Sequence, residues 1–414
     1  MRTRPYIPLL IFALFFLLIN GYAFSALTLV FPPVVYSWLW VIPTILFLAF
    51  SYSMIRLSVN GPTQLFKISA HSLLIYFVSM LVFVLATVLT DAYRLVLAMG
   101  KYFSDGTFNF PQRPITGIYI SILLGLLIII AFIYGIIKGK YAYRVIRHTL
   151  YFDDLPEAFD GLKLVQISDV HAGSLKNPKA VQKGIDLINK QQADLFVFTG
   201  DLVNNKAEEI KPYLHHFSQI KAPLGQFSVL GNHDYGDYIK WESDLVKNQN
   251  LQQLKNYHAE IGFRLLLDEH VKIEKNGQHL TLLGIENWGL GFGERGDLQK
   301  ALQGTNKEEF KILLSHDPSH WEAQVKNSPS KIQLTLAGHT HGMQFGFEAF
   351  GFKWSPVQFR YKHWAGVKQE NQRILNVNRG FGFIGFSGRV GIWPEITLIE
   401  LKKNSLKKQD INFI

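Results

Sequence analysis

The sequence predicts two parts, an N-terminal α-helical transmembrane bundle followed by an α/β domain. Four long uncharged stretches occur before Lys138, each about as long as a bilayer-spanning helix of roughly 20 residues. From about Leu155 onward, short apolar runs alternate with helix-like patterns, which is typical of a layered α/β domain. We therefore expect a membrane domain in residues 1–150 and a second domain in residues 151–414.

The uncharged stretches lie near residues 7–24 and 36–54, between residues 67 and 91, and between residues 113 and 138. We interpret the first as a span and not as a cleaved signal peptide, because no small-residue cleavage site follows it and further spans do. An even number of spans places both ends of the bundle on the same side of a membrane.

The distribution of Lys and Arg predicts which side that is. Positive side chains favour the cytoplasmic face, and they flank the N-terminus, the loop after the second span and the end of the fourth: Arg2, Arg4, Arg56, Lys67, Lys138, Lys140, Arg144 and Arg147. The loop after the third span also holds Arg94, Lys101 and Arg113, offset in part by two aspartates. We expect a multi-pass protein of the cell inner membrane with its second domain on the cytoplasmic face.

Composition excludes several kinds of site. The chain has no cysteine, so it has no disulfide, thiolate zinc site, iron–sulfur cluster or cysteine nucleophile. The net charge is +10, but residues 1–150 hold 11 of the 42 basic residues and only two of the 32 acidic ones. Since the excess positive charge belongs to the apolar third, it indicates membrane topology, and no nucleic-acid partner is expected.

The second domain begins with strands that alternate with helices. The apolar runs "GLKLVQIS", "ADLFVFTGD", "GQFSVLGNHD", "FKILLSHD" and "IQLTLAGHTHG" predict five strands. Residues 178–192 carry apolar positions on one helical face, and Asn276-Gly277 predicts the turn of a hairpin. In such domains ligands bind at the carboxyl ends of the strands.

At the end of each of the five predicted strands, the sequence has residue types that can bind metals. Residues i and i+2 of an extended chain point to the same side, so each strand end can direct two ligands at one point. Asp, Asn and His without thiolates suit two divalent ions that share a carboxylate. Each residue alone could instead be a helix cap or a turn residue, but all five ends together favour a metal site. The candidates are Asp169, His171, Asp201, Asn204, Asn232, His233, Asp234, His316, His339 and His341.

The order D-x-H, G-D, G-N-H-D, a single H and G-H-T-H-G resembles the calcineurin-like metallophosphoesterase superfamily over residues 162–400. "GHTHGMQF" followed by "NRGFGFIGFSGRVGIWPEITLIEL" is most similar to its bacterial membrane-associated branch with N-terminal transmembrane helices. Met343 stands where that branch has a second glycine, and we expect it to narrow the substrate mouth. The resemblance implies a four-layer α/β/β/α sandwich.

The resemblance also implies roles for the candidates. One metal would take Asp169, His171, Asp201 and His341, and the other Asp201, Asn232, His316 and His339, with Asp201 bridging. His233 would protonate the leaving oxygen with Asp234 holding its ring, and a metal-activated hydroxide would attack phosphorus. Asn204 would support the site. Arg379 and Arg389 would either contact the phosphate or form structural salt bridges.

The membrane part bears on the substrate. Some membrane-associated relatives hydrolyse the pyrophosphate of UDP-diacylglucosamine, and residues 345–366 mix Phe, Trp and Tyr with Lys and Arg, as at a lipid headgroup level or in a flap over the site. We expect a hydrolase of lipid metabolism that cleaves phosphodiester or pyrophosphate bonds with two divalent ions, Mn²⁺, Zn²⁺ or Fe²⁺.

Two alternatives remain open from the sequence. A general or cyclic-nucleotide phosphodiesterase merely anchored by its helices would keep full activity without residues 1–150. A membrane sensor with an inactive catalytic domain would normally lack some ligands, and none is missing here. The sequence does not determine the oligomeric state.

Overall fold

The computed structural model describes residues 6–60 and 63–404, which form two compact units that divide between Tyr134 and Gly135. The division falls earlier in the chain than residue 150, because β1 (Arg144–Phe152) already pairs with β14 (Glu395–Lys403) in the sheet of the second unit. Arg2 and Arg4, on which part of the topology prediction rests, lie outside the described residues.

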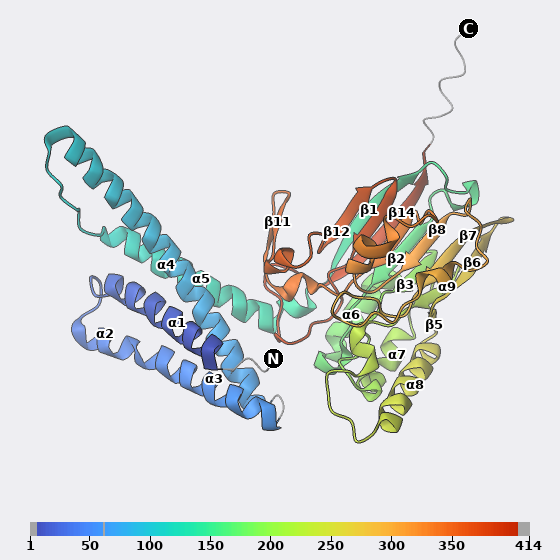
Figure 1. Ribbon diagram of the computed structural model, residues 1–414, viewed down its shortest axis with the longest axis horizontal. Helices are drawn as coiled ribbons and strands as arrows, with labels where there is room; N and C mark the ends of the chain where they lie inside the picture. The colour runs from blue at the N-terminus through green and yellow to red at the C-terminus, as the bar shows by residue number, and fades with distance from the viewer. Residues whose placement is uncertain (1–5, 61–62, 405–414) are drawn as a thin grey trace, which may run out of the picture. The chain divides into compact units, whose positions relative to one another are not determined.

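The first unit is helical, and four of its segments are long and apolar enough to cross a membrane, as the sequence predicts. These segments are 10–27, 33–57, 64–105 and 115–137. The helices are α1 (Tyr6–Leu27), α2 (Pro33–Leu39), α3 (Val41–Asn60), α4 (Gln64–Asp105) and α5 (Ile115–Ile137), the last of which leads into the second unit (Figure 1). α4 begins at Thr63, whose side chain accepts the amide hydrogen of Phe66, and ends at Gly106 in the left-handed conformation.

Small and hydroxyl side chains bring the helices of the first unit together. Ser79 donates to the carbonyl of Gly125 over 2.7 Å, and Thr87 donates to Ser121 over 3.2 Å. Small residues at such contacts let helix backbones approach closely in a membrane, where hydrophobic burial alone does not drive association.

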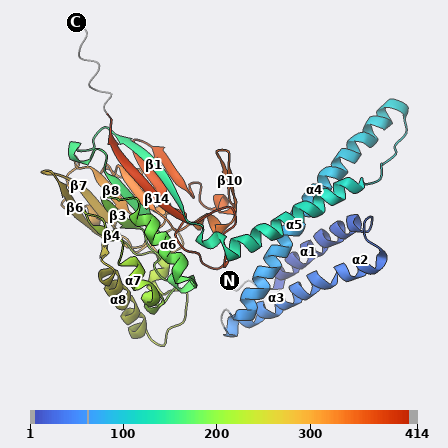
Figure 2. The same cartoon turned by 180° about the vertical axis from the view of Figure 1, so that it is seen from behind.

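The second unit contains two six-stranded sheets, which Figure 2 shows from behind. The first has the order β1, β14, β2 (Lys163–Ile167), β3 (Leu195–Phe198), β4 (Gln226–Ser228) and β5 (Arg264–Leu265). The second has the order β12 (Gly366–Glu370), β13 (Arg373–Val377), β9 (Leu334–Ala337), β8 (Lys311–Leu314), β7 (Gln278–Gly284) and β6 (Glu269–Lys275). β6 and β7 form the predicted hairpin, with Asn276 and Gly277 both at positive φ. A separate pair, β10 (Phe347–Ala349) and β11 (Phe352–Trp354), follows the last predicted metal ligands.

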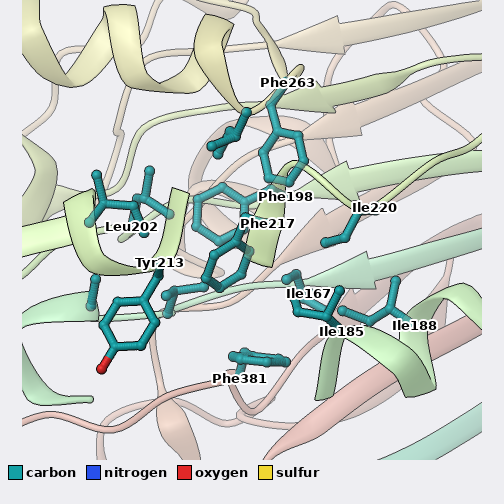
Figure 3. Close-up of a cluster of buried hydrophobic side chains, with 14 of the residues drawn as sticks. Ile167, Ile185, Ile188, Phe198, Leu202, Tyr213, Phe217, Ile220, Phe263 and Phe381 are labelled. Carbon is teal, nitrogen blue, oxygen red and sulfur yellow. The ribbon is translucent and has the colours of Figure 1, made fainter. Parts of the chain in front are cut away.

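Side chains point alternately to the two faces of each sheet, so each sheet packs against the other sheet on one face and against helices on its other face. The result is four layers. On β8, Ile312 and Leu314 face a core that both sheets share, whereas Leu313 faces a second core with α9 (Leu298–Leu302). On the far side of the first sheet, a third core packs α6 (Pro178–Asn189), α7 (Leu214–Phe217) and α8 (Asp244–Glu260) against β2 and β3, with Ile185 and Phe217 among its labelled side chains (Figure 3). The predicted α/β/β/α sandwich is therefore confirmed.

Candidate metal centre

The predicted ligands follow the carboxyl ends of strands that run in parallel. β2, β3 and β4 are parallel neighbours in one sheet, and β8 and β9 are parallel neighbours in the other. The loops after these strands carry the predicted ligands Asp169, His171, Asp201, Asn232, His316, His339 and His341.

The structure gathers six of these side chains into two groups. In each group the ligand atoms lie within 4.8 Å of one another, and the groups are Asp169, His171 and His341, and Asp201, His316 and His339. In the first group, Nε2 of His171 lies 3.0 Å from Nε2 of His341, which is 3.2 Å from Oδ1 of Asp169. In the second, Nδ1 of His339 lies 3.2 Å from Nε2 of His316. Ring nitrogens that converge on one carboxylate are the arrangement that a divalent ion requires.

Asp201 connects the two groups. Its Oδ2 lies 3.1 Å from Nε2 of His316 and 3.6 Å from Nε2 of His171, so one carboxylate oxygen faces a histidine of each group. Nδ1 of His316 lies 2.7 Å from the carbonyl oxygen of Thr199. Because a carbonyl only accepts, Nδ1 carries a proton, and Nε2, which faces Asp201, is the nitrogen that a metal would take.

The backbone at the ligands is not extended. Asp169, His171, Asp201, His339 and His341 all have positive φ, between 47° and 70°. Residues other than glycine rarely adopt this backbone conformation, and such residues are concentrated at functional sites. The prediction that ligands at positions i and i+2 project from extended strand, which concerns the pairs Asp169/His171 and His339/His341, was therefore wrong. β2 ends at Ile167 and β9 at Ala337, and left-handed turns beyond them aim the ligands.

Two glycines allow the loops to approach the carboxylates. A Cβ at Gly231 would lie 2.2 Å from Oδ1 of Asp201. A Cβ at Gly338 would lie 1.9 Å from Oγ of Ser168 and 2.4 Å from Oδ2 of Asp169. No side chain fits at either position, so close packing around the carboxylates explains these two glycines.

Two buried oxygens fit the chemistry of a metal ligand. In the described part of the chain, Oδ1 of Asn232 and Oδ1 of Asp169 accept no hydrogen bond. Buried polar atoms without a partner are uncommon in folded proteins, and a bound ion can satisfy such an atom. The amide nitrogen of Asn232 donates to the hydroxyl of Tyr238 over 2.7 Å, which turns the side-chain oxygen in the opposite direction. The residues present therefore fit two divalent ions held by nitrogen and oxygen.

Buried charges support the same assignment. Burial alone would raise the pKa of Asp201, but His316 and His233 lower it well below its usual value. Burial alone would lower the pKa of His316, but the carboxylates of Asp201 and Asp169 raise it to about 10. Burial lowers the pKa of His171 well below its usual value. The pKa of Asp169 is lowered as well, against its burial, by His341 and His316. Asp201 and Asp169 are thus ionised in a buried space, where they attract positive charge.

His233 and Asp234 do not interact as the sequence analysis expected. Nδ1 of His233 lies 2.9 Å from the carbonyl oxygen of Asn204, so this carbonyl, and not Asp234, holds the ring. The ring also stacks on Tyr238 with a centroid distance of 4.3 Å. The carboxylate of Asp234 instead accepts the amide hydrogens of Asp201, Leu202, Val203 and Gly231. Asp234 therefore fixes the backbone of the two neighbouring ligand loops.

Asn204 holds the turn beside His233. Besides accepting from His233, it donates through its side chain to Ser174 over 3.1 Å and through its backbone to Glu209 over 2.6 Å. These contacts fix the turn whose carbonyl sets the tautomer of His233.

The two arginines of the sequence analysis, Arg379 and Arg389, make different contacts. Arg379 forms ion pairs with Glu395 and, over 2.6 Å, with Glu348, so the structure shows the salt-bridge alternative. Arg389 is fully buried, and its guanidinium contacts the carbonyls of Arg379, Gly380 and Gly382. Its Nη2 also lies 3.1 Å from Nδ1 of His341. Arg389 thus ties the segment after β13 to the last histidine loop.

Sequence reasoning missed Asp317. Its Oδ2 lies 3.4 Å from Nε2 of His339 and accepts the hydroxyl hydrogen of Tyr361 over 3.0 Å. Carboxylates in this position orient metal-binding histidines. Asp317 directly follows His316 in "SHDP", and that adjacency was the available signal.

Apolar space adjoins the metal centre. A pocket of about 390 Å³ is bounded by His339 and by apolar side chains that include Met343 and Phe359. A second pocket of about 760 Å³ shares Arg360 and Tyr361 with it. Met343 lies at positive φ on the wall of the first pocket and is half exposed.

The layered fold and the paired Asp/His groups define a metal-dependent hydrolase. Residues 3–140 match the family described as "Probable Calcineurin-like phosphoesterase, transmembrane domain", and residues 162–343 match "Calcineurin-like phosphoesterase". The chain belongs to the calcineurin-like metallophosphoesterase superfamily, in the branch with an N-terminal four-helix transmembrane domain. It is therefore a membrane protein and a hydrolase.

Curated proteins of several organisms are similar to the chain. A "Transmembrane protein with metallophosphoesterase domain" of Danio rerio is 28% identical over 66% of this chain and 60% of its own length. A protein of Bos taurus with the same description is 27% identical over 88% of this chain and 80% of its own length. The "Uncharacterized metallophosphoesterase YkuE" of Bacillus subtilis is 28% identical over 63% of this chain and 85% of its own length. The chain thus spans less than two thirds of the Danio rerio protein.

Proposed function

We propose that the protein uses two divalent ions, with manganese as the first candidate, to hydrolyse a phosphodiester or pyrophosphate bond of a lipid-linked substrate such as UDP-diacylglucosamine. The observation that carries the proposal is the pair of Asp/His groups on either side of Asp201, together with the apolar pocket that begins at His339. The first feature supports phosphoester chemistry, and the second supports a substrate with an apolar part.

One ion would be held by Asp169, His171, Asp201 and His341. The other would be held by Asp201, Asn232, His316 and His339. Together they would supply Lewis-acid chemistry, which makes a water molecule more acidic and offsets charge on the phosphoryl oxygens.

The chain's own residues orient the reaction. The carbonyl of Asn204 fixes the proton of His233 at Nδ1, so Nε2 is the atom that can exchange a proton with substrate. In its protonated form, His233 donates that proton from Nε2 to the leaving oxygen. Tyr238 keeps the ring in place by stacking, and its hydroxyl orients Asn232.

A lipid-linked substrate accounts for the surface beside the pocket. Residues 345–366 follow the last histidine loop and present the exposed side chains Phe347, Phe350, Phe352 and Phe359. Arg360 lies between the two pockets, with its guanidinium 4.7 Å from the ring centroid of Phe292. Apolar walls bind an acyl chain and a guanidinium binds phosphate, so this surface suits a lipid that carries phosphate.

The proposed location is the cell inner membrane, with several spans and the catalytic domain in the cytoplasm. The number of candidate spans supports this, since four crossings return the chain to the side on which it begins. Lys138, Lys140, Arg144 and Arg147 follow the last candidate span, where the positive-inside rule places cytoplasmic residues.

The test is Mn²⁺-dependent hydrolysis by the full-length protein in detergent, with UDP-diacylglucosamine compared with a soluble aryl phosphodiester. The proposal expects the lipid to be cleaved much faster, and Asn232→Ala to abolish this cleavage. Cleavage of the aryl ester alone would leave the phosphoesterase chemistry intact and refute the lipid substrate. Cleavage of neither compound with any divalent ion would refute the catalytic proposal and favour the sensor.

A further inference from the structure

The first unit contains a polar cluster that the phosphoesterase activity does not use. Asp91 accepts hydrogen bonds from Arg94 over 2.5 Å and from Nη2 of Arg113 over 2.6 Å. Tyr22 also donates to Asp91 over 2.7 Å, and Nη1 of Arg113 donates to Ser25 over 3.0 Å. The segments that meet here come from α1, α4 and the start of α5.

The cluster lies where the candidate spans end. Ser25 is in the last turn of α1, and Arg113 immediately precedes the apolar run of α5, which starts at Ile115. α4 has 42 residues and is therefore about 63 Å long, roughly twice the hydrocarbon thickness of a bilayer. Asp91 lies 27 residues after the start of α4 at Gln64, about 40 Å along the helix. A span that begins at Gln64 crosses the roughly 30 Å hydrocarbon core before it reaches Asp91, which places the cluster at the headgroup level.

The cluster carries excess positive charge and unused donors. Two guanidinium groups face a single carboxylate, which leaves a net charge of +1. Nη2 and Nε of Arg94 donate to the carbonyl of Pro111, and each terminal nitrogen of both arginines makes one hydrogen bond to the described residues. Since each terminal nitrogen has two hydrogens, four N–H groups have no acceptor among the described residues.

The unused donors border a cavity. Arg94, Arg113 and their shared carboxylate Asp91 line a pocket of about 700 Å³, which also has the apolar side chains of Leu29, Phe110 and Ile115 on its wall. The guanidinium carbon of Arg94 lies 4.2 Å from the ring centroid of Phe110, which holds the arginine in place. The pocket thus places arginine side chains next to apolar side chains. A phospholipid likewise has a charged headgroup next to apolar acyl chains.

We propose that this pocket binds the phosphate headgroup of an anionic phospholipid, with the two guanidinium groups on the phosphate and Leu29 and Phe110 against the start of the acyl chains. Guanidinium groups match phosphate geometry through paired hydrogen bonds. With both ends of the bundle in the cytoplasm, the connection between the third and fourth spans lies at the opposite face, so the bound lipid would come from that leaflet. The site is separate from the metal centre, and the proposal does not depend on the substrate cleaved there.

Native mass spectrometry of the full-length protein tests the proposal, with phosphatidylglycerol, diacylglycerol and inorganic phosphate as probes. Arg94→Gln removes one guanidinium but leaves the Asp91–Arg113 pair intact, so the fold keeps its buried charge balanced. Leu29→Trp places a larger side chain in the cavity without removing any ion pair. Arg56→Gln, an exposed arginine at the end of α3, is the matched control.

We expect the wild type and Arg56→Gln to retain phosphatidylglycerol. Arg94→Gln should lose about tenfold in retention because hydrogen bonds to a charged group are lost. Leu29→Trp should lose a similar amount because the larger side chain takes space from the lipid. Equal retention by Arg94→Gln and the wild type would overturn the proposal. Equal retention of diacylglycerol would show that the phosphate is not recognised. Binding of inorganic phosphate with the affinity of the lipid would show an anion site without lipid selectivity.

Discussion

Replacing Asp317 by asparagine removes the carboxylate that orients His339 and leaves the shape of the site nearly unchanged. Asp317 is fully buried, and its Oδ2 lies 3.4 Å from Nε2 of His339, so solvent does not screen the interaction. Loss of such an outer partner costs about 10- to 100-fold in metal affinity, which equals about 1.4–2.7 kcal/mol. We expect this loss for the ion assigned to Asp201, Asn232, His316 and His339, and little change for the other ion.

Isothermal titration of the metal-free, full-length protein with Mn²⁺ measures both affinities. Asp186→Asn is the control, because Asp186 is exposed on α6, away from the metal centre. The wild type and the control should bind two ions with unchanged affinities, whereas Asp317→Asn should weaken one of them. Wild-type affinities in Asp317→Asn, or equal weakening of both ions, would refute the assignment of Asp317 to His339.

Three further predictions follow from particular contacts. Gly338→Ala should abolish metal binding, because its Cβ would lie 1.9 Å from Oγ of Ser168; Gly100→Ala, with nothing within 4 Å, should leave metal content unchanged. Burial lowers the pKa of His258 to about 3, so as pH falls below 6.5 the unfolded state binds a proton that the folded state does not. This residue should therefore cost about 2 kcal/mol of the free energy of unfolding by pH 5, and in chemical denaturation His258→Gln should lose about 2 kcal/mol less than the wild type over that range. Tyr238→Phe should lower kcat several-fold by freeing the amide that its hydroxyl orients, with KM nearly unchanged; a change confined to KM would instead indicate a substrate contact.

The strand ends could be predicted from the sequence because apolar runs and the residues that follow them are local features. The runs before Asp169, Asp201 and Asn232 end at parallel strands of one sheet, and parallel strands bring their carboxyl ends to one edge. The turn at Asn276-Gly277 was predictable for the same reason, since its conformation depends on two adjacent residues.

Contacts between distant segments could not be predicted in this way. Asp234 is next to His233 in sequence, yet its carboxylate binds the backbone of the loop after β3. Arg379 forms ion pairs with Glu395 and Glu348, which lie in segments that only the folded chain brings together. The left-handed backbone at the ligands also has no sequence signal, because it is imposed by the loops around the site and not by the residues themselves.

α4 differs from its expected extent for a related reason. The uncharged stretch predicts a span that ends at Asp91, whereas the helix continues to Asp105. Charges end the apolar run, but they do not end the helix, which stops at Gly106 in the left-handed conformation. Asp91 and Arg94 therefore lie on a continuous helix, where they build the cluster proposed to bind lipid phosphate.

The central claim is that two ions meet at Asp201. Its most direct test is the metal content of the full-length protein after loading with Mn²⁺, measured by inductively coupled plasma mass spectrometry. Hydrolysis of an aryl phosphodiester is measured on the same samples. We predict two ions per chain in the wild type, and fewer ions with loss of hydrolysis in Asp201→Asn. Full hydrolysis by metal-free protein, or two ions and full activity in Asp201→Asn, would contradict the claim.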